Sequence, residues 1–222
     1  MFDRKVLKAN GKAAFKSNYW YAVLWAFVLS LLTAGGAYST SANTSYQNDG
    51  SGIHLAIAGI GLGITLVVVV IRLVVGCPYR VGYARWRIGC AEGRAQNADI
   101  GYAFNGGRIG GAIAGIFFTD LIIFLWSLLF VIPGIVAAYK YRLVPYLMAE
   151  NENMTGKEAR ARSAEMMKGK KAAAFFLDLS FIGWILLSIL TCGILAIFWV
   201  APYINATECE LYRFLRDTGA QA

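Results

Sequence analysis

Four long stretches with almost no charged residues constrain this chain more than any other feature. They cover residues 19–37, 53–71, 109–139 and 172–205, and the last two contain only Asp120 and Asp178. The hydrocarbon core of a bilayer, about 30 Å thick, needs about 20 mostly apolar residues per crossing helix. The stretches therefore predict an integral membrane protein.

Composition excludes the other broad classes of protein. The 222 residues are 58% hydrophobic, 14% aromatic and 15% charged, whereas soluble domains average about 25% charged residues. Aromatic residues are too frequent for a disordered chain. Four dispersed cysteines do not form the dense framework of a disulfide-stabilised domain.

The last two stretches are too long for one crossing each, and basic residues indicate how they fold. At 1.5 Å per residue, about 31 and 34 residues make roughly 46 and 51 Å of helix. Lys and Arg, which collect in cytoplasmic loops, cluster before residue 19, between 72 and 108, between 140 and 171, and after 212. All of these clusters lie on one side only if both stretches double back, with outer turns near 132–134 and 191–193.

We therefore predict an all-α membrane protein with six transmembrane helices in three hairpins and both termini in the cytoplasm. Residues 1–18 form a basic amphipathic interfacial helix, and 19–222 form a single membrane domain. Cytoplasmic loops cover 77–108 and 150–171. The expected helices are 19–37, 53–76, 109–131, 134–149, 172–191 and 193–216.

The hairpins resemble one another, which indicates a degenerate internal repeat. In the second and third hairpins an Asp precedes a Trp by six residues, and a Pro-Tyr pair follows further on; the first hairpin keeps Trp25 and Pro78-Tyr79 but lacks the acid. Repeats are common in transporters, and duplication of a stable hairpin without transport is the alternative. The candidate hinge or kink residues are Pro133, Gly134, Pro145, Gly193 and Pro202.

Segments outside the predicted spans point to lipid as the partner. Residues 2–16 place Phe2, Val6, Ala9 and Ala13 on one helical face and lysines elsewhere, which suits the headgroup layer of an anionic membrane. Arg and aromatic residues alternate over 79–87, and at a membrane boundary this favours interfacial anchoring over nucleic acid binding. We expect the lipid bilayer, with anionic lipid at the cytoplasmic face, and no nucleic acid. Glycines at 59, 61 and 63 would allow close helix packing, so a homo-oligomer is an open alternative.

Ionisable residues within the predicted spans form a candidate intramembrane polar site of Asp120, Asp178, Lys140 and Arg142. Both acids are about 20 Å below the outer turns by helical rise. Arg142 can reach Asp120 or Asp178. One interpretation is a buried ion pair or a helix-capping aspartate that locks hairpins together, and a second is a polar cavity or a proton- or ion-coupled path. A third is that the aspartates lie in the wetted headgroup layer because their helices start late.

Signals for enzymatic chemistry in the sequence are poor, although Asp120 and Asp178 could in principle form an aspartyl dyad. The single histidine, His54, lies at the outer mouth of the second span, and no CxxC or His-rich spacing indicates a metal. Glu208 and Glu210 are two residues apart on a helix and face different sides. We expect no catalytic residue, no metal and no cofactor.

Several short motifs resemble a bacterial family. The longest is the stretch from Phe176 to Trp184; the others are Ile132-Pro133-Gly134-Ile135, Pro145-Tyr146, Thr155-x-x-Glu158-Ala159, Met167-Lys168-Gly169, Pro202-Tyr203 and Glu210-x-Tyr212. The chain resembles the integral-membrane family 975 of the domain-of-unknown-function series, common in Gram-positive bacteria. The resemblance implies a cytoplasmic-membrane location and no established activity, so it supplies no catalytic residues.

Three functional hypotheses follow. The first is a non-enzymatic accessory or export-related component that handles lipids or amphiphiles. The second is a small solute or ion transporter that uses Asp120 and Asp178. The third is a structural or regulatory module that docks partners or anionic lipid. A transporter predicts a cavity that reaches the aspartates, and a scaffold predicts a closely packed bundle with paired polar groups.

Overall fold

The computed structural model describes residues 4–28, 67, 69–105, 107–191 and 193–219. The described part is helical and contains no strand, so the predicted all-α class is confirmed. His54, the glycines at 59–63, Cys192 and most of the predicted helix 53–76 lie outside the described residues. The number of membrane crossings and the hairpin repeat stay predictions.

The chain begins with α1 (Arg4–Ser17) and a helical segment at Tyr19–Val28, and resumes with a π-helical turn, η1 (Arg72–Gly76). The following elements are α4 (Cys77–Glu92), the 3-10 helix η2 (Asn97–Phe104), α5 (Ile109–Leu129), α6 (Val131–Tyr141), α7 (Val144–Glu150) and α8 (Gly156–Met166). The last are α9 (Lys171–Leu179), α10 (Ile182–Leu190), a π-helical turn η3 (Ala196–Val200) and α11 (Ala201–Gly219).

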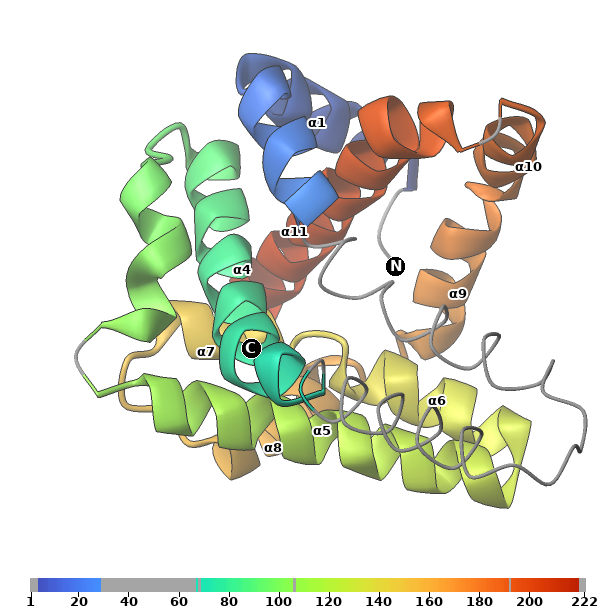
Figure 1. Cartoon of the computed structure of the whole chain (residues 1–222). Helices are drawn as coiled ribbons and strands as arrows, with labels where there is room; N and C mark the ends of the chain where they lie inside the picture. The colour runs from blue at the N-terminus through green and yellow to red at the C-terminus, as the bar shows by residue number, and fades with distance from the viewer. Residues whose placement is uncertain (1–3, 29–66, 68, 106, 192, 220–222) are drawn as a thin grey trace, which may run out of the picture.

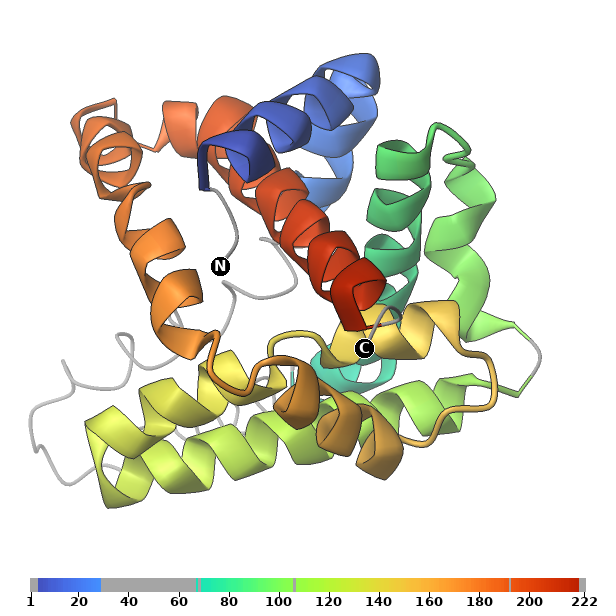
Figure 2. The same cartoon turned by 180° about the vertical axis from the view of Figure 1, so that it is seen from behind.

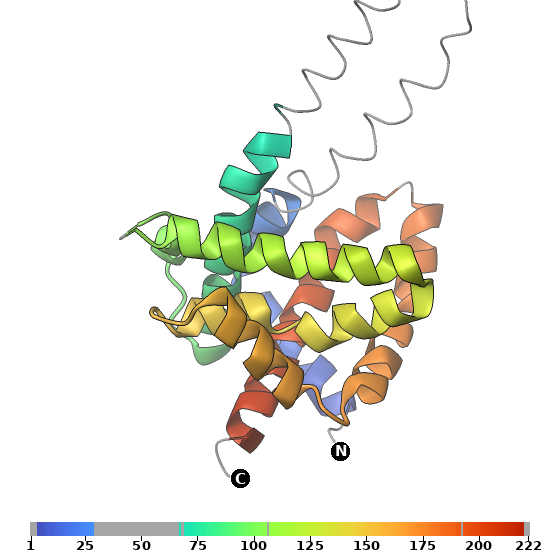
Figure 3. The same cartoon turned by 90° about the horizontal axis from the view of Figure 1, so that it is seen from below.

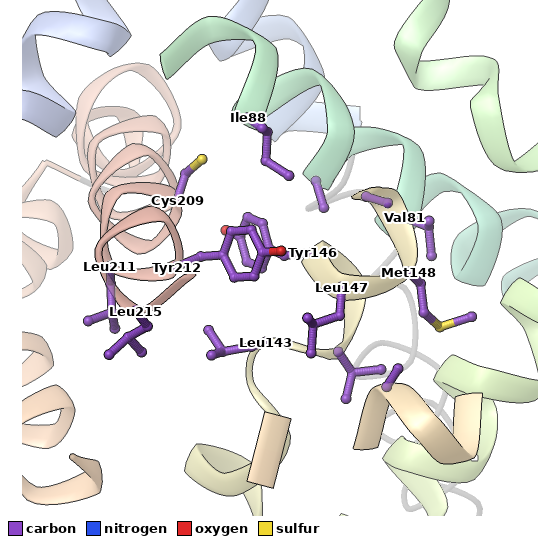
Figure 4. Packing of buried hydrophobic residues seen from close by; sticks show 14 of the residues in the cluster. Val81, Ile88, Leu143, Tyr146, Leu147, Met148, Cys209, Leu211, Tyr212 and Leu215 are labelled. Carbon is purple, nitrogen blue, oxygen red and sulfur yellow. The ribbon is translucent and has the colours of Figure 1, made fainter. Parts of the chain in front are cut away.

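Helices α4, α7 and α11 meet at the centre of the molecule (Figure 1). Tyr146 of α7 stacks on Tyr212 of α11 with ring centroids 5.0 Å apart, and both side chains are buried. Figure 4 shows these two rings between aliphatic side chains of α4, α7 and α11. Buried aromatic pairs of this kind add stability beyond the area that they remove from water.

Helix α1 packs along α11, as Figures 1 and 2 show from opposite sides. Leu7 and Gly11 are buried on this side of α1, and a Cβ atom at Gly11 would come within 2.9 Å of the Thr207 backbone. Val6, on the face predicted to meet lipid, is 53% exposed. The helix thus packs against the protein through a second face, and the described residues of the predicted lipid face, Val6, Ala9 and Ala13, are exposed.

The prediction of a loop over residues 77–108 is wrong in one respect, because most of this segment is helical. Pro78 occupies the second position of α4, directly after η1, where its missing N–H group is tolerated. Five of the predicted loop's Arg and Gly residues lie inside α4. Gly82 allows the backbone of η2 to cross α4 closely, since a Cβ atom there would be 2.0 Å from the Ile100 carbonyl oxygen.

The outer turn of the second predicted hairpin lies slightly earlier than expected. Helix α5 ends at Leu129, Phe130 is extended (φ −156°), and α6 begins at Val131. Pro133 therefore occupies the first turn of α6, where an N–H group needs no helical partner. Gly134 lets α6 approach α5, because a Cβ atom there would be 2.6 Å from Cα of Ser127. Figure 3 shows α5 and α6 side by side.

The other candidate hinge residues lie near boundaries between elements, although the helix continues from η3 into α11 without a break at Pro202. Pro145 and Pro202 occupy the second positions of α7 and α11, and Pro202 follows the π-helical turn η3. Gly193 adopts a left-handed backbone (φ 83°) shortly after α10 ends. The capping box that opens α8 is present, with Thr155 Oγ1 accepting from the Glu158 N–H and Glu158 accepting from the Thr155 N–H.

Two helical stretches in the described part are long and apolar enough to cross a bilayer: α5, and Lys171–Leu190, which joins α9 and α10. They differ from the core helices of soluble proteins, which are mostly buried. In each of the two stretches, only 22% of the most apolar 18 residues is buried. The two stretches run in different directions, with α9 and α10 leading away from the α5–α6 pair (Figures 1 and 2). The described helices thus do not form a bundle of parallel rods.

The close crossing at Gly82 gives a first prediction. Gly82→Ala should lower the free energy of unfolding by about 1–3 kcal/mol, because the new methyl group meets backbone that cannot rotate away. Gly76→Ala is the matched control, since no atom lies within 4 Å of its Cβ position. Thermal unfolding in detergent measures both variants, and equal melting temperatures would contradict this packing.

Candidate functional site

The guanidinium group of Arg142 is the centre of a network of buried charges. It lies between α6 and α7 and donates to Asp178 of α9 through two bonds, Nη1 to Oδ2 at 2.7 Å and Nη2 to Oδ1 at 3.0 Å. Its third nitrogen, Nε, donates to Oε1 of Glu208 on α11 at 2.9 Å. Of the two pairings that the sequence allowed for Arg142, the structure contains the one with Asp178.

The break between α6 and α7 holds Arg142 in this position. Ser163 of α8 is fully buried, and its hydroxyl donates to the Lys140 carbonyl at 2.8 Å. The same hydroxyl accepts from the Leu143 N–H at 3.3 Å. A side chain from another helix thus satisfies backbone groups that the break leaves without helical partners.

Glu208 extends the network to α4. Its Oε2 atom accepts from Arg87 Nη1 at 3.1 Å, and the same Arg87 nitrogen donates to the Asn205 carbonyl at 3.1 Å. The Arg87 guanidinium also lies 4.7 Å from the ring centroids of both Tyr83 and Tyr146. Such contacts between a cation and an aromatic ring are strongest where water is excluded.

The network is electrically balanced and largely shielded from solvent. Two arginines face two carboxylates, and the side chains of Arg87, Arg142 and Glu208 are 9%, 15% and 18% exposed, whereas Asp178 is 32% exposed. Tyr139 donates to Asp178 at 2.7 Å and satisfies a further lone pair. Removal of Glu208 would leave Arg87 without its counterion, and removal of Arg142 would do the same to Asp178; breaking a buried pair in this way costs several kcal/mol.

Asp120 and Lys140 lie apart from this network. Asp120 pairs with Arg80 of α4 at 2.6 Å, in a bond whose side chains are 50% and 36% exposed. The ammonium group of Lys140 lies 5.1 Å from the ring of Tyr141. The four residues of the predicted site therefore divide into one buried pair and two groups with other neighbours.

Two cavities adjoin the charged groups. A cavity of about 290 Å³ is lined by Arg80, Arg87, Asp120, Arg142 and Glu208 together with apolar residues of α5 and α6. A more apolar cavity of about 510 Å³, which is open to the surface, is lined by Ile135, Ala138, Tyr139, Arg142, Phe175 and Asp178. Both predicted aspartates therefore border a cavity, as the transport hypothesis requires, although each is also paired, as the structural hypothesis requires.

Three charged residues of the site were missing from the sequence-based set: Arg80, Arg87 and Glu208. Arg80 and Arg87 were assigned to a loop, but their seven-residue spacing places them on one face of α4. Glu208 and Glu210 do point to different partners, Glu210 bonding to Arg213 at 2.8 Å. One signal in the sequence could have identified Glu208. It lies on a helix that continues an apolar run, and no Lys or Arg three or four positions away could neutralise it.

Thiol and metal chemistry find little support in this region. Cys77, Cys90 and Cys209 are free thiols, and Cys77 and Cys209 are buried. Burial, with help from the nearby Asp99 carboxylate, raises the pKa of the Cys90 thiol to about 12, so this thiol stays protonated at neutral pH. Within the described part, no three His, Cys, Asp or Glu side chains gather as metal ligands would.

A family model described as a protein of unknown function (DUF975) matches residues 106–218, just over half of the chain. The matched region begins before α5 and ends in α11, so it contains Asp120, Arg142, Asp178 and Glu208, whereas Arg80 and Arg87 precede it. Searches of curated proteins and of solved structures found no match.

The difference between the buried and exposed ion pairs gives a second prediction. Glu208→Gln should lower the free energy of unfolding by about 3–5 kcal/mol, because Arg142 and Arg87 both lose their shared counterion. Asp120→Asn is the matched control and should cost less than about 1 kcal/mol, since its pair is half exposed. Denaturant unfolding in mixed micelles measures both, and equal losses would contradict the assigned burial.

Proposed function

The chain belongs to this DUF975 family of proteins of unknown function, and from that premise we propose that it handles lipids or amphiphiles in the bacterial cytoplasmic membrane. In this proposal it is a multi-pass, non-enzymatic component, accessory to another process or related to export. The observation that carries the proposal is the pairing of a charged cavity with an apolar one among helices that expose apolar surface.

The exposed apolar surface supports the membrane location. Leu128, Ile132 and Leu190 are 73%, 75% and 80% exposed, and they lie at the ends of the α5–α6 pair and of α10. Contiguous apolar patches of this kind are rare on soluble monomers and are typical of surfaces that meet lipid or a partner. Lipid satisfies such a surface without any further protein.

The charge distribution supports the proposed orientation. The ends of α5 and α6 that meet at Phe130 carry no charged side chain, and neither does α10. Helix α8 and the start of α9 carry Lys157, Arg160, Arg162 and Lys171. In the three-hairpin arrangement these basic residues lie in the cytoplasm, as the distribution of Lys and Arg in membrane proteins favours.

Two alternatives have their own support. A cavity that reaches Asp120 favours a solute or ion transporter. The exposed side of α1, with Arg4, Lys5 and Lys12, favours a module that docks on anionic lipid. Reconstituted vesicles distinguish them, since a transporter moves solute and a docking module alters only vesicle binding.

The orientation is the third prediction. A reporter or a single accessible cysteine placed at Lys157 should be cytoplasmic, and one at Ile132 should be reached from outside the cell, because the two sites lie at opposite ends of α6 and its following segments. Labelling of whole cells with a membrane-impermeant thiol reagent measures this in a variant without native cysteines. Labelling of the Lys157 site from outside would contradict the three-hairpin arrangement.

The amphiphile proposal is tested on the purified full chain. Native mass spectrometry after mild detergent extraction should detect a stoichiometric bound amphiphile. Protein that carries only exchangeable bulk lipid, and that binds no added amphiphile, would contradict the proposal.

A further inference from the structure

The two cavities have a common wall, and this arrangement defines a class of ligand. Ala138 and Arg142 line both the charged cavity of about 290 Å³ and the apolar cavity of about 510 Å³. We propose that together they form one site for a single-chain amphiphile with a phosphate headgroup, in which Asp120 competes with the headgroup for Arg80. This inference rests on the proposed function and specifies its ligand.

The charged cavity favours an anionic headgroup. Its lining contains the guanidinium groups of Arg80, Arg87 and Arg142 and the carboxylates of Asp120 and Glu208, and Asp178 balances the third arginine through its two bonds to Arg142. The positive charge available to a headgroup is therefore that of Arg80, once this side chain leaves Asp120. Guanidinium groups bind phosphate through two parallel N–H···O bonds, and this geometry makes Arg the preferred residue for phosphate recognition. A neutral headgroup would not compete with Asp120 for Arg80 in this way.

The apolar cavity suits one hydrocarbon chain. The rings of Tyr139 and Phe175 form one wall in an edge-to-face pair with centroids 6.1 Å apart, and Ile135 and Ala138 of α6 form another. Its charged members, Arg142 and Asp178, are bonded to each other by two hydrogen bonds. The remaining lining is apolar, so burial of an alkyl chain there is favourable.

Arg80 is the arginine able to change partners. All three nitrogens of Arg142 donate to carboxylates within the buried network, and Arg87 is held by Glu208 and Asn205. Arg80 has the half-exposed Asp120 as its counterion, and such a pair contributes little net free energy. An entering phosphate can therefore replace Asp120 as the partner of Arg80.

This competition predicts effects of opposite sign at the two members of one ion pair. Arg80→Gln should weaken binding of a phosphate amphiphile about tenfold, because a charge-assisted contact is lost. Asp120→Asn should tighten binding severalfold, because Arg80 no longer has a competing carboxylate and the headgroup no longer meets a negative charge. If the pair had only a structural role, both variants would change amphiphile binding in the same direction.

The experiment uses the full chain in a neutral detergent and measures dissociation constants by equilibrium dialysis. The probes are hexadecyl phosphate, hexadecyl glucoside and inorganic phosphate. We expect hexadecyl phosphate to bind about tenfold more tightly than the glucoside, and inorganic phosphate alone to bind far more weakly than hexadecyl phosphate because it cannot fill the apolar cavity.

A second pair of variants tests the common wall. Ala138→Phe places a ring between the two cavities and should weaken binding of both amphiphiles, whereas Ala114→Phe adds the same ring to an exposed position of α5 outside either lining. Thermal unfolding confirms that each variant is folded before binding is measured.

The outcomes separate this inference from the proposed function. If both amphiphiles bind equally, or if Asp120→Asn weakens binding of hexadecyl phosphate, the headgroup assignment is wrong and the broader amphiphile function stands. If inorganic phosphate binds as tightly as hexadecyl phosphate, the site takes a free anion and the inference fails. If neither amphiphile binds, the proposed function fails as well.

Discussion

The buried bonds of Arg142 constrain the arrangement of the helices more than any other interaction. A guanidinium group enclosed by apolar helices is tolerable only when counterions are brought to it. Asp178 and Glu208 supply these counterions from α9 and α11, and Glu208 in turn reaches Arg87 on α4. The requirement for neutrality thus fixes the relative positions of helices that are distant in the sequence.

Around this network the molecule has two kinds of region, a buried centre and exposed apolar helix ends. The centre, at Tyr146 and Tyr212, is packed and buried as in a soluble core. The ends of α5, α6 and α10 instead expose leucine, isoleucine and phenylalanine side chains. Exposed apolar ends of this kind are typical of surfaces that meet lipid or a partner. The cavities lie between these regions, next to the charged network.

The sequence predicted the elements that depend on local signals and missed those that depend on distant contacts. Prolines and glycines predicted the turns near residues 130 and 193, since their backbone restrictions act locally, whereas the predicted helix 134–149 is interrupted at 142–143, just before Pro145. Helical rise placed Asp178 within reach of Arg142. The same arithmetic allowed Asp120 as a partner, and only the fold shows that Arg80 is closer. Arginine content made residues 77–108 resemble a loop, although apolar faces and stacked aromatic rings make most of that segment a packed helix.

The most direct test of this account is a double-mutant cycle on Arg142 and Glu208. Each residue is replaced by leucine singly and together, and the free energy of unfolding is measured in mixed micelles. If the pair organises the fold, each single variant loses several kcal/mol and the double variant loses much less than their sum, a coupling of about 1–3 kcal/mol. Additive losses would show that the two side chains act independently and would contradict the central role of Arg142.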